Sequence, residues 1–257
     1  MRSVVAMAIC VALLTGCASY SSDRNARWQQ AASAPTPSPT VNPSPSGKAP
    51  DRPPRPASRG KWGPHGTIRS TGTSVVALTF DDGPHPVWTP RILASLREAG
   101  VKATFCVIGA QARRYPNLIR AIVRDGHALC NHSWNHDFGL GSRSRTHITA
   151  DLARTNSAIW AAVPAAPIRY YRQPGGKWTK RVVQVARELG MRSLHWSVDP
   201  QDWRKPPARQ ITGTVIKGTR KGGIVLLHDG GGDRSCTHRA LYRILPNLTR
   251  RFRLAPL

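Results

Sequence analysis

Two adjacent aspartates, Asp81 and Asp82, end an apolar segment and are followed by Gly83 and Pro84. On a regular strand the two side chains would point to opposite faces, but a turn at this point allows both to reach one pocket. Two carboxylates that close repel each other, so one takes up a proton unless a cation lies nearby. The pair therefore predicts a metal site, with one carboxylate as ligand and the other free for proton transfer. An Asx-turn with an exposed aspartate is the alternative.

Polar residues also follow several later apolar segments. His132 and His136 are four residues apart, so they can lie on one face and bind the same metal. Two histidines and one carboxylate leave coordination positions open for water, as in catalytic zinc sites. Paired histidines on a surface turn are the alternative, and the carboxylate pair at another strand end favours the metal. Further polar groups follow later segments: Arg172, then Asp199 and Asp202 with Trp203, then His228.

The segments that carry these residues alternate between strand and helix patterns. Strands are predicted at 75–80, 102–108, 127–131, 170–171, 193–198 and 224–227, with 252–257 as a candidate last strand. Helices are predicted at 89–99, 117–124, 152–163, 181–189, 211–217 and 241–248. This alternation indicates an α/β fold with a parallel sheet, open or closed into a barrel. Either form places the chemistry at the carboxyl ends of the strands.

The polar residues at these predicted strand ends make the chain resemble a known family. Over about residues 72–257 it resembles the NodB-type polysaccharide deacetylases, carbohydrate esterase family 4. The five family motifs occur in order: Thr79-Phe-Asp-Asp-Gly-Pro84, His132-Ser-Trp-Asn-His136, Arg172-x-Pro174-x-Gly176, Asp199-x-x-Asp202-Trp203 and Leu226-x-His228. Each motif alone is modest, but five in order are highly specific. The resemblance implies a distorted (β/α) barrel, a single catalytic domain and a metal-dependent deacetylase.

The resemblance also implies how the metal and the base are arranged. Asp82, His132 and His136 would bind a divalent metal, with Zn²⁺ preferred over Co²⁺ or Mn²⁺. Asp81 would act as general base on the water that attacks the acetamide carbonyl, and Arg172 would orient Asp81. A carboxylate beside a cation stays ionised, which is the state that can accept a proton.

The remaining roles implied by the resemblance concern the acid and the substrate. His228 would protonate the leaving amine, because an amine leaves poorly unless it is protonated, and Asp202 would hold His228 in its charged form. The backbone N–H of Gly175 would stabilise the oxyanion. Trp203 and Leu226 would form the walls of the pocket for the acetyl methyl group.

One position departs from the family pattern. The third motif often has an aromatic residue where this chain has Gly175. The backbone N–H survives this change, but a side-chain wall of the sugar groove is lost, and the nearby Trp178 is a candidate to replace it. Trp134, inside the second motif, is either a sugar-stacking surface or a core residue.

The N-terminal part of the chain predicts export. The apolar stretch 4–14 follows Arg2 and is too short to span a membrane, as in a signal peptide. Its end, Leu14-Thr-Gly-Cys17, resembles the bacterial lipobox, which predicts lipidation of Cys17; a plain signal-peptidase site is the alternative. The domain organisation expected is a signal peptide at 1–17, a Pro/Ser-rich disordered linker at 18–71 and the catalytic domain at 72–257.

Charge and cysteines give further expectations. With 38 Lys and Arg against 13 Asp and Glu, the net charge of +25 favours attraction to an anionic wall polymer. A bias toward arginine with no partner is the alternative, and the charges show no run typical of a nucleic-acid-binding arm. Cys106 and Cys130 lie on neighbouring predicted strands, so they are the preferred disulfide pair, with two buried thiols as the alternative.

Together these features predict an exported enzyme, lipid-anchored on the outer face of the bacterial cell membrane, or else secreted. It would remove the N-acetyl group from a glycan that contains N-acetylglucosamine. Peptidoglycan leads, because it is the polymer nearest to a tethered enzyme. Acetylxylan or chitooligosaccharide deacetylation is the enzymatic alternative. A non-catalytic wall-binding protein is the other, but a binder would need neither Asp81 nor His228.

Overall fold

The computed structural model describes residues 60–257. One parallel sheet runs in the order β5-β4-β3-β2-β1-β6. The strands are β1 (Ala77–Asp81), β2 (Thr104–Val107), β3 (Ala128–Asn131), β4 (Ile168–Tyr171), β5 (Arg192–Ser193) and β6 (Ile224–His228). The helices are α1 (Trp88–Glu98), α2 (Gly109–Arg114), α3 (Pro116–Arg124), α4 (Arg145–Ala162), α5 (Lys180–Glu188), α6 (Ala208–Gly218) and α7 (Ser235–Arg251). Four 3₁₀ turns are η3 (Pro64–Gly66), η4 (Leu140–Ser142), η5 (Pro174–Gly176) and η6 (Asp202–Arg204).

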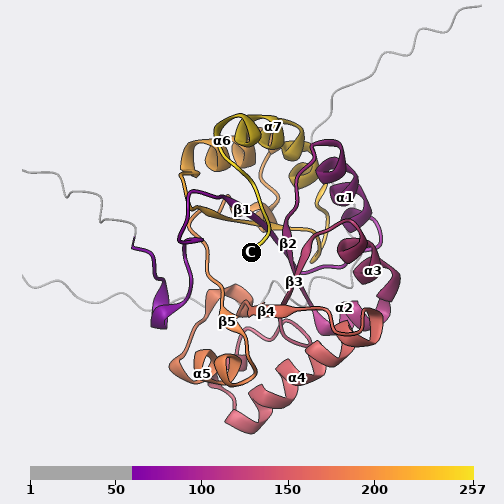
Figure 1. Ribbon diagram of the computed structural model, residues 1–257, viewed down its shortest axis with the longest axis vertical. Helices are drawn as coiled ribbons and strands as arrows, with labels where there is room; N and C mark the ends of the chain where they lie inside the picture. The colour runs from indigo at the N-terminus through magenta and orange to yellow at the C-terminus, as the bar shows by residue number, and fades with distance from the viewer. Residues whose placement is uncertain (1–59) are drawn as a thin grey trace, which may run out of the picture. The chain divides into compact units, whose positions relative to one another are not determined.

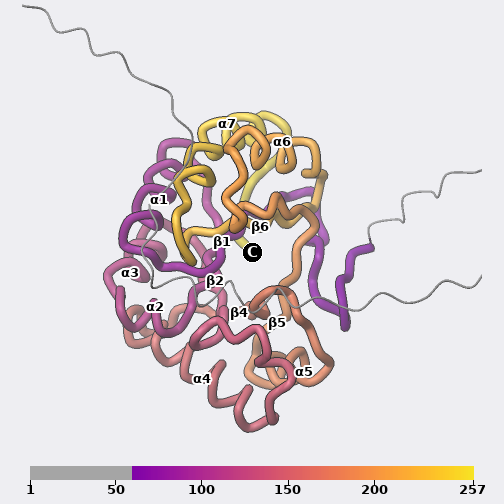
Figure 2. The backbone as a smooth tube through the Cα atoms, turned by 180° about the vertical axis from the view of Figure 1, so that it is seen from behind, coloured from indigo at the N-terminus to yellow at the C-terminus, as the bar shows by residue number. Residues whose placement is uncertain are grey.

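The helices surround the curled sheet on its outer side, with α6 and α7 together at one end and α4 and α5 at the other (Figures 1 and 2). This arrangement is a half-barrel of strands and helices, and it confirms the predicted distorted (β/α) barrel. Because every pair of neighbouring strands is parallel, all six carboxyl ends lie at the same edge of the sheet.

Alternation along the strands separates the packing face of the sheet from the face that carries chemistry. In β1, Leu78 and Phe80 belong to the main core beneath the helices, whereas Ala77 packs on the opposite, inner face. A strand turns successive side chains to opposite faces, so Asp81 also lies on the inner face. The same alternation in β6 gives His228 the inner face, and the register pairs His228 with Asp81.

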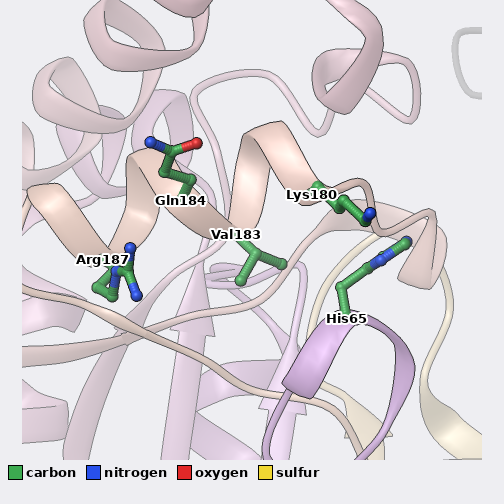
Figure 3. Close-up of a pocket in the computed structure, with 5 residues that line it drawn as sticks. All are labelled: His65, Lys180, Val183, Gln184 and Arg187. Atoms are coloured by element: carbon green, nitrogen blue, oxygen red, sulfur yellow. The ribbon is translucent and has the colours of Figure 1, made fainter.

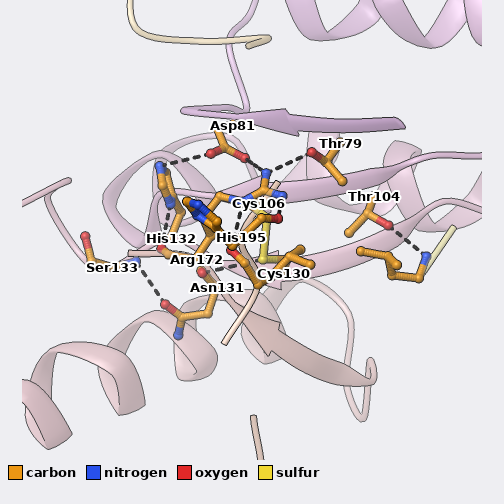
Figure 4. The surroundings of a disulfide bond; sticks show 12 residues. Thr79, Asp81, Thr104, Cys106, Cys130, Asn131, His132, Ser133, Arg172 and His195 are labelled. Atoms are coloured by element: carbon orange, nitrogen blue, oxygen red, sulfur yellow. Dashed lines mark hydrogen bonds and ion pairs between the residues drawn. A yellow bond between two sulfur atoms is a disulfide. The ribbon is translucent and has the colours of Figure 1, made fainter. Parts of the chain in front are cut away.

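A disulfide joins Cys106 of β2 to Cys130 of β3, with their Cα atoms 4.1 Å apart. The two residues are directly paired in the sheet register and lie on its inner face. Figure 4 shows the surroundings of the disulfide, among them Asp81, Asn131 and Arg172. Of the two alternatives left open by the sequence, the structure therefore has the disulfide.

Three predictions about elements need correction. The strand predicted at 193–198 is reduced to Arg192–Ser193, and the chain beyond it makes only isolated bridges. The candidate strand at 252–257 makes a single bridge, from Leu254 to Val76, and is not a strand. Helix α2 was missed because it has six residues and buries only Gly109 and Ala112, which is too small an apolar stripe to show a helical period.

The domain begins before residue 72. Ile68, within the segment assigned to the linker, is only 7% exposed, and its N–H bonds to the carbonyl of Ser193 at 2.8 Å. The signal peptide, Cys17 and the linker as far as residue 59 lie outside the described residues. Within residues 60–257, no helix combines the length and apolar character that crossing a membrane requires.

Candidate active site

The paired aspartates occupy the carboxyl end of β1, as the sequence predicts. Asp81 is the last residue of the strand, and Asp82 adopts a left-handed conformation with φ +73° that turns its side chain toward the same side. Gly83 follows because a Cβ there would overlap the carboxylate of Asp229. Because both aspartate side chains lie on the same side, one histidine contacts both of them. His132 Nε2 lies 3.6 Å from Asp81 Oδ2 and 3.4 Å from Asp82 Oδ1.

Asp82, His132 and His136 form one cluster whose candidate ligand atoms all lie within 4.8 Å of one another. The Nε2 atom of His136 is 3.1 Å from Asp82 Oδ1, an atom that is buried and has no hydrogen-bond partner among the described residues. The Nδ1 atom of His132 lies 2.8 Å from the carbonyl of Arg172, so it carries the proton and leaves the Nε2 lone pair free. An unpaired carboxylate oxygen between two imidazole nitrogens fits a divalent cation.

The charges in this cluster reinforce one another. Burial alone would raise the pKa of Asp82, but the charge of His136 and the close approach of both imidazole nitrogens hold it well below its ordinary value. Burial would lower the pKa of His136, but the Asp82 charge raises it. Asp82 is therefore ionised, which is the state a metal ligand requires.

Two residues that the sequence analysis missed fix the loop that carries the histidines. Asn131 ends β3, and its Oδ1 accepts a hydrogen bond from the N–H of Ser133, which has φ +65°. Its Nδ2 donates to Asn156 Oδ1 of α4 at 2.8 Å. Asp151, also on α4, accepts from the N–H of Trp134 at 2.8 Å, and burial raises the pKa of this carboxyl to about 6. Asn131 directly precedes the histidine motif, but nothing in the local sequence marks Asp151.

Arg172 lies completely buried beneath Asp81. Its Nη1 donates to Asp81 Oδ1 at 2.7 Å and to Thr79 Oγ1 at 2.8 Å (Figure 4). Its Nε and Nη2 donate to the carbonyls of Leu194 and His195, both at 3.2 Å. The planar guanidinium is thus held from several directions and fixes the Asp81 carboxylate. Thr79 was missed as a contributor, although its spacing of two residues from Asp81 places it on the same face.

His228 ends β6 and pairs with Asp202 of η6. The distance from His228 Nδ1 to Asp202 Oδ1 is 2.6 Å, and Asp202 Oδ2 accepts from the His228 N–H and from Thr237 Oγ1 of α7. Burial alone would lower the pKa of His228, but the charge and hydrogen bond of Asp202 raise it to about 9. The imidazole is therefore protonated at neutral pH, with Nε2 left to face a substrate.

Asp229, next to His228, is a further buried carboxyl that the sequence analysis missed. Its N–H donates to the carbonyl of Asp81 at 3.0 Å, and its Oδ2 accepts from Thr89 Oγ1 at 2.5 Å. The same Thr89 hydroxyl accepts from the N–H of His85 at 2.7 Å. Thr89 lies in the first turn of α1, whose N-cap is Val87. Burial raises the pKa of Asp229 to about 7, and the residue ties the turn after β1 to β6.

The residues predicted to bind the substrate lie around these groups. Gly175 is exposed in η5 and has φ +61°, a conformation that favours glycine. Leu226 precedes His228 by two residues, so it faces the same side of the sheet, and it is almost fully buried. Trp203 directly follows Asp202 in η6, with 42% of its surface exposed.

The sequence left open whether Trp134 and Trp178 contact a sugar, and both are core residues. Trp178 is 7% exposed, and its ring packs edge-on against Tyr171 at 6.0 Å between centroids. The sequence analysis gave Trp178 as a candidate to replace the aromatic wall missing at Gly175, but its buried ring does not do so. Trp134 is 6% exposed, and the guanidinium of Arg154 covers its ring at 3.7 Å. Trp134 thus packs and does not offer a face to a sugar.

A surface hollow of about 400 Å³ lies elsewhere, between α5 and the turn η3 (Figure 3). It is lined by His65, Lys180, Val183, Gln184 and Arg187. None of these residues belongs to the strand-end motifs, so this hollow is separate from the candidate active site.

Comparison with known proteins places the chain in a family. Residues 68–194 match the family described as polysaccharide deacetylase. A chitooligosaccharide deacetylase from Sinorhizobium fredii is 41% identical over 69% of this chain and 87% of its own length. A peptidoglycan-N-acetylglucosamine deacetylase from Bacillus cereus is 39% identical over 68% of this chain and 81% of its own length.

A solved structure agrees with these relatives. The Bc1960 peptidoglycan N-acetylglucosamine deacetylase, in complex with 4-naphthalen-1-yl-N-oxidanyl-benzamide, superposes with a TM-score of 0.69 at 32% identity. The match covers 73% of this chain and 87% of that chain. The similarity thus extends to the whole fold as well as to the sequence.

Proposed function

Because the chain belongs to the polysaccharide deacetylase family, we propose that it hydrolyses the N-acetyl group of N-acetylglucosamine units in peptidoglycan and releases acetate. It is an amide-hydrolysing deacetylase. The main support for this hydrolysis is that three groups of residues meet at one edge of the sheet. These are the cluster around Asp82, the Asp81 carboxylate held by Arg172, and the protonated His228.

The residues present fit a divalent cation. Asp82, His132 and His136 would hold it, and two imidazoles with one carboxylate favour Zn²⁺. When bound, such a cation supplies a Lewis acid for the acetamide carbonyl and favours ionisation of a water. The unpaired Oδ1 atom of Asp82 is the structural feature that supports this assignment.

Two protons move in the reaction. As the oxygen of water bonds to the carbonyl carbon, Asp81 accepts the proton that the water loses. His228 donates the proton on its Nε2 to the amide nitrogen as the carbon–nitrogen bond breaks. The products are then a sugar amine and acetic acid, which loses its remaining proton to water and becomes acetate at neutral pH. Arg172 fixes Asp81 in position, and Asp202 keeps His228 protonated.

The substrate-facing groups complete the proposal. The Gly175 N–H would donate to the oxygen that gains negative charge, because a backbone donor held in place needs no reorganisation during the reaction. Leu226 and Trp203 would enclose the methyl group, since both flank the Asp202–His228 pair. These roles are supported by the positions of the three residues at the carboxyl ends of the strands.

Location favours peptidoglycan over other glycans. The lipobox-like end of the signal, with Cys17 as the lipidated residue, would tether the enzyme to the outer face of the cell membrane, beside the wall. The net charge of +25 would add attraction to anionic wall polymers. The related chitooligosaccharide deacetylases make short chitin oligomers the second candidate substrate.

The test is acetate release from purified peptidoglycan, chitooligosaccharides and acetylxylan, each with and without a chelator. We expect release from peptidoglycan that stops on chelation and returns when Zn²⁺ is added. The matched control is His228→Ala, which should bind the glycan but release little acetate. Binding of peptidoglycan with no acetate release by the parent protein would instead identify a non-catalytic wall-binding protein.

A further inference from the structure

An exposed aromatic ring lies where Gly175 leaves room for one. A Cβ placed on Gly175 would be 2.5 Å from Cδ1 and 2.7 Å from Cε1 of Phe138. The Phe138 ring therefore lies directly against the backbone of Gly175, in the space that a side chain at position 175 would begin to fill. The two residues come from different segments, since Phe138 follows the histidine loop and Gly175 follows β4.

Phe138 also borders the metal cluster. Its ring centroid is 4.8 Å from that of His136, in an edge-on arrangement, and Lys177 Nζ lies 5.7 Å from the same ring. In spite of these contacts, 38% of Phe138 remains exposed. An aromatic ring with a free face beside convergent polar groups is the kind of lining that small-molecule sites use.

Three of the other aromatic residues around the site do not offer this face. Trp134 and Trp178 are buried in the core. Trp203 is exposed but directly follows Asp202, the residue that pairs with the general acid His228. Phe138 thus provides an aromatic surface on the metal side, next to the backbone N–H of Gly175.

We propose that Phe138 is a specificity-determining residue, whose exposed face stacks against the apolar face of the N-acetylhexosamine ring. The proposal rests on the function proposed above and names the group that recognises the sugar. A pyranose ring presents a face of C–H groups, and these pack favourably against the negative face of an aromatic ring. Phe138 would therefore make the enzyme select acetamides carried on a sugar ring over small acetamides without one.

The test uses the metal-loaded full chain with Phe138→Leu and Phe138→Tyr. Leucine keeps an apolar side chain against Gly175 and His136 but has no flat face, whereas tyrosine keeps the ring. Tyr242→Ala is the matched control, because Tyr242 is an aromatic residue with 58% exposure on α7. The readouts are metal content, and kcat and KM on an N-acetylglucosamine oligomer and on N-methylacetamide.

We expect Phe138→Leu to raise KM for the oligomer by about twofold to tenfold, the range of one aromatic stacking contact, with little change in kcat. Its metal content and its kcat/KM on N-methylacetamide should stay at the parent level, and Phe138→Tyr and Tyr242→Ala should behave as the parent. An unchanged KM in Phe138→Leu would overturn the proposal. So would an equal loss on both substrates, or a parallel loss of metal, because Phe138 would then only support His136.

A binding measurement separates this proposal from the proposed function. Calorimetry with the oligomer on the metal-loaded parent and Phe138→Leu proteins reports stacking whether or not acetate is released. If the parent releases no acetate but loses affinity on Phe138→Leu, the function fails and the role of Phe138 stands. If the parent releases acetate and the Phe138→Leu protein binds the oligomer with the same affinity as the parent, the function stands and the role of Phe138 fails.

Discussion

Replacing Asp202 with asparagine should reverse the direction in which the pKa of His228 is shifted. In the native chain two opposing effects act on this imidazole: burial lowers its pKa, and the Asp202 charge and hydrogen bond raise it from 6.5 to about 9. Asparagine has nearly the shape of aspartate but no charge, so burial remains while the principal raising effect is lost. We therefore expect the pKa of His228 to fall below 6.5 in Asp202→Asn.

The size of the effect follows from the native shift. A rise from 6.5 to about 9 corresponds to roughly 3 kcal/mol in favour of the imidazolium, at 1.36 kcal/mol for each pH unit. Because the folded-state pKa is raised, this stabilisation is fully present below pH 6.5 and is lost as the pH rises through about 9. The free energy of unfolding of the metal-free native protein should therefore decline across this interval, and that of Asp202→Asn should lack this decline.

The direct assay is an NMR titration of the His228 ring in protein labelled with ¹³C-histidine, supported by the pH profile of kcat/KM. The alkaline limb of that profile should move to lower pH, because His228 must be protonated to act as the acid. Thr237→Val is the control: it removes a hydrogen bond to Asp202 Oδ2 but keeps the charge, so the pKa should remain well above 6.5. A His228 pKa that stays near 9 in Asp202→Asn would refute the reasoning.

Three further predictions concern the metal, the anchor and the charge. Asp81→Asn should keep its metal but lose roughly 10²- to 10⁴-fold in rate, the usual contribution of a general base, while His132→Ala should lose both; metal analysis beside acetate release checks this, and a fully metal-loaded His132→Ala would contradict it. Cys17→Ala should move the protein from membranes to the soluble exported fraction on cell fractionation, and unchanged membrane association after a salt wash would count against a lipid anchor. Activity on intact walls should fall as salt rises, while activity on a neutral N-acetylglucosamine oligomer should hardly change; equal salt responses would leave the positive charge without a role in binding.

The order of elements was predictable because glycines and apolar periods mark them locally. Gly100, Gly126 and Gly190 stand just after the predicted helices 89–99, 117–124 and 181–189, and all three have positive φ just after α1, α3 and α5. Segments whose structure depends on distant partners were not predictable. The chain after Arg192–Ser193 has the composition of a strand, yet only Leu194 and Val198 in it make isolated bridges, and no local pattern records that outcome.

The candidate site divides in the same way. The side chains at the strand ends are recognisable because their motifs are contiguous in sequence, and the structure brings Asp82, His132 and His136 together as expected. The residues that hold them lie far away in the chain, such as Asp151 on α4. The contact of Phe138 with Gly175 joins two loops whose approach only the folded backbone determines, and for this reason the sequence pointed to Trp178 instead.

The most direct test of the central claim is acetate release from peptidoglycan by one protein sample, measured as isolated, after chelation and after stoichiometric Zn²⁺ is returned, with bound metal determined at each stage. We predict that acetate release falls and recovers in proportion to about one equivalent of bound metal, as expected for one site made by Asp82, His132 and His136. Acetate release that continues undiminished in the metal-free sample would contradict the account.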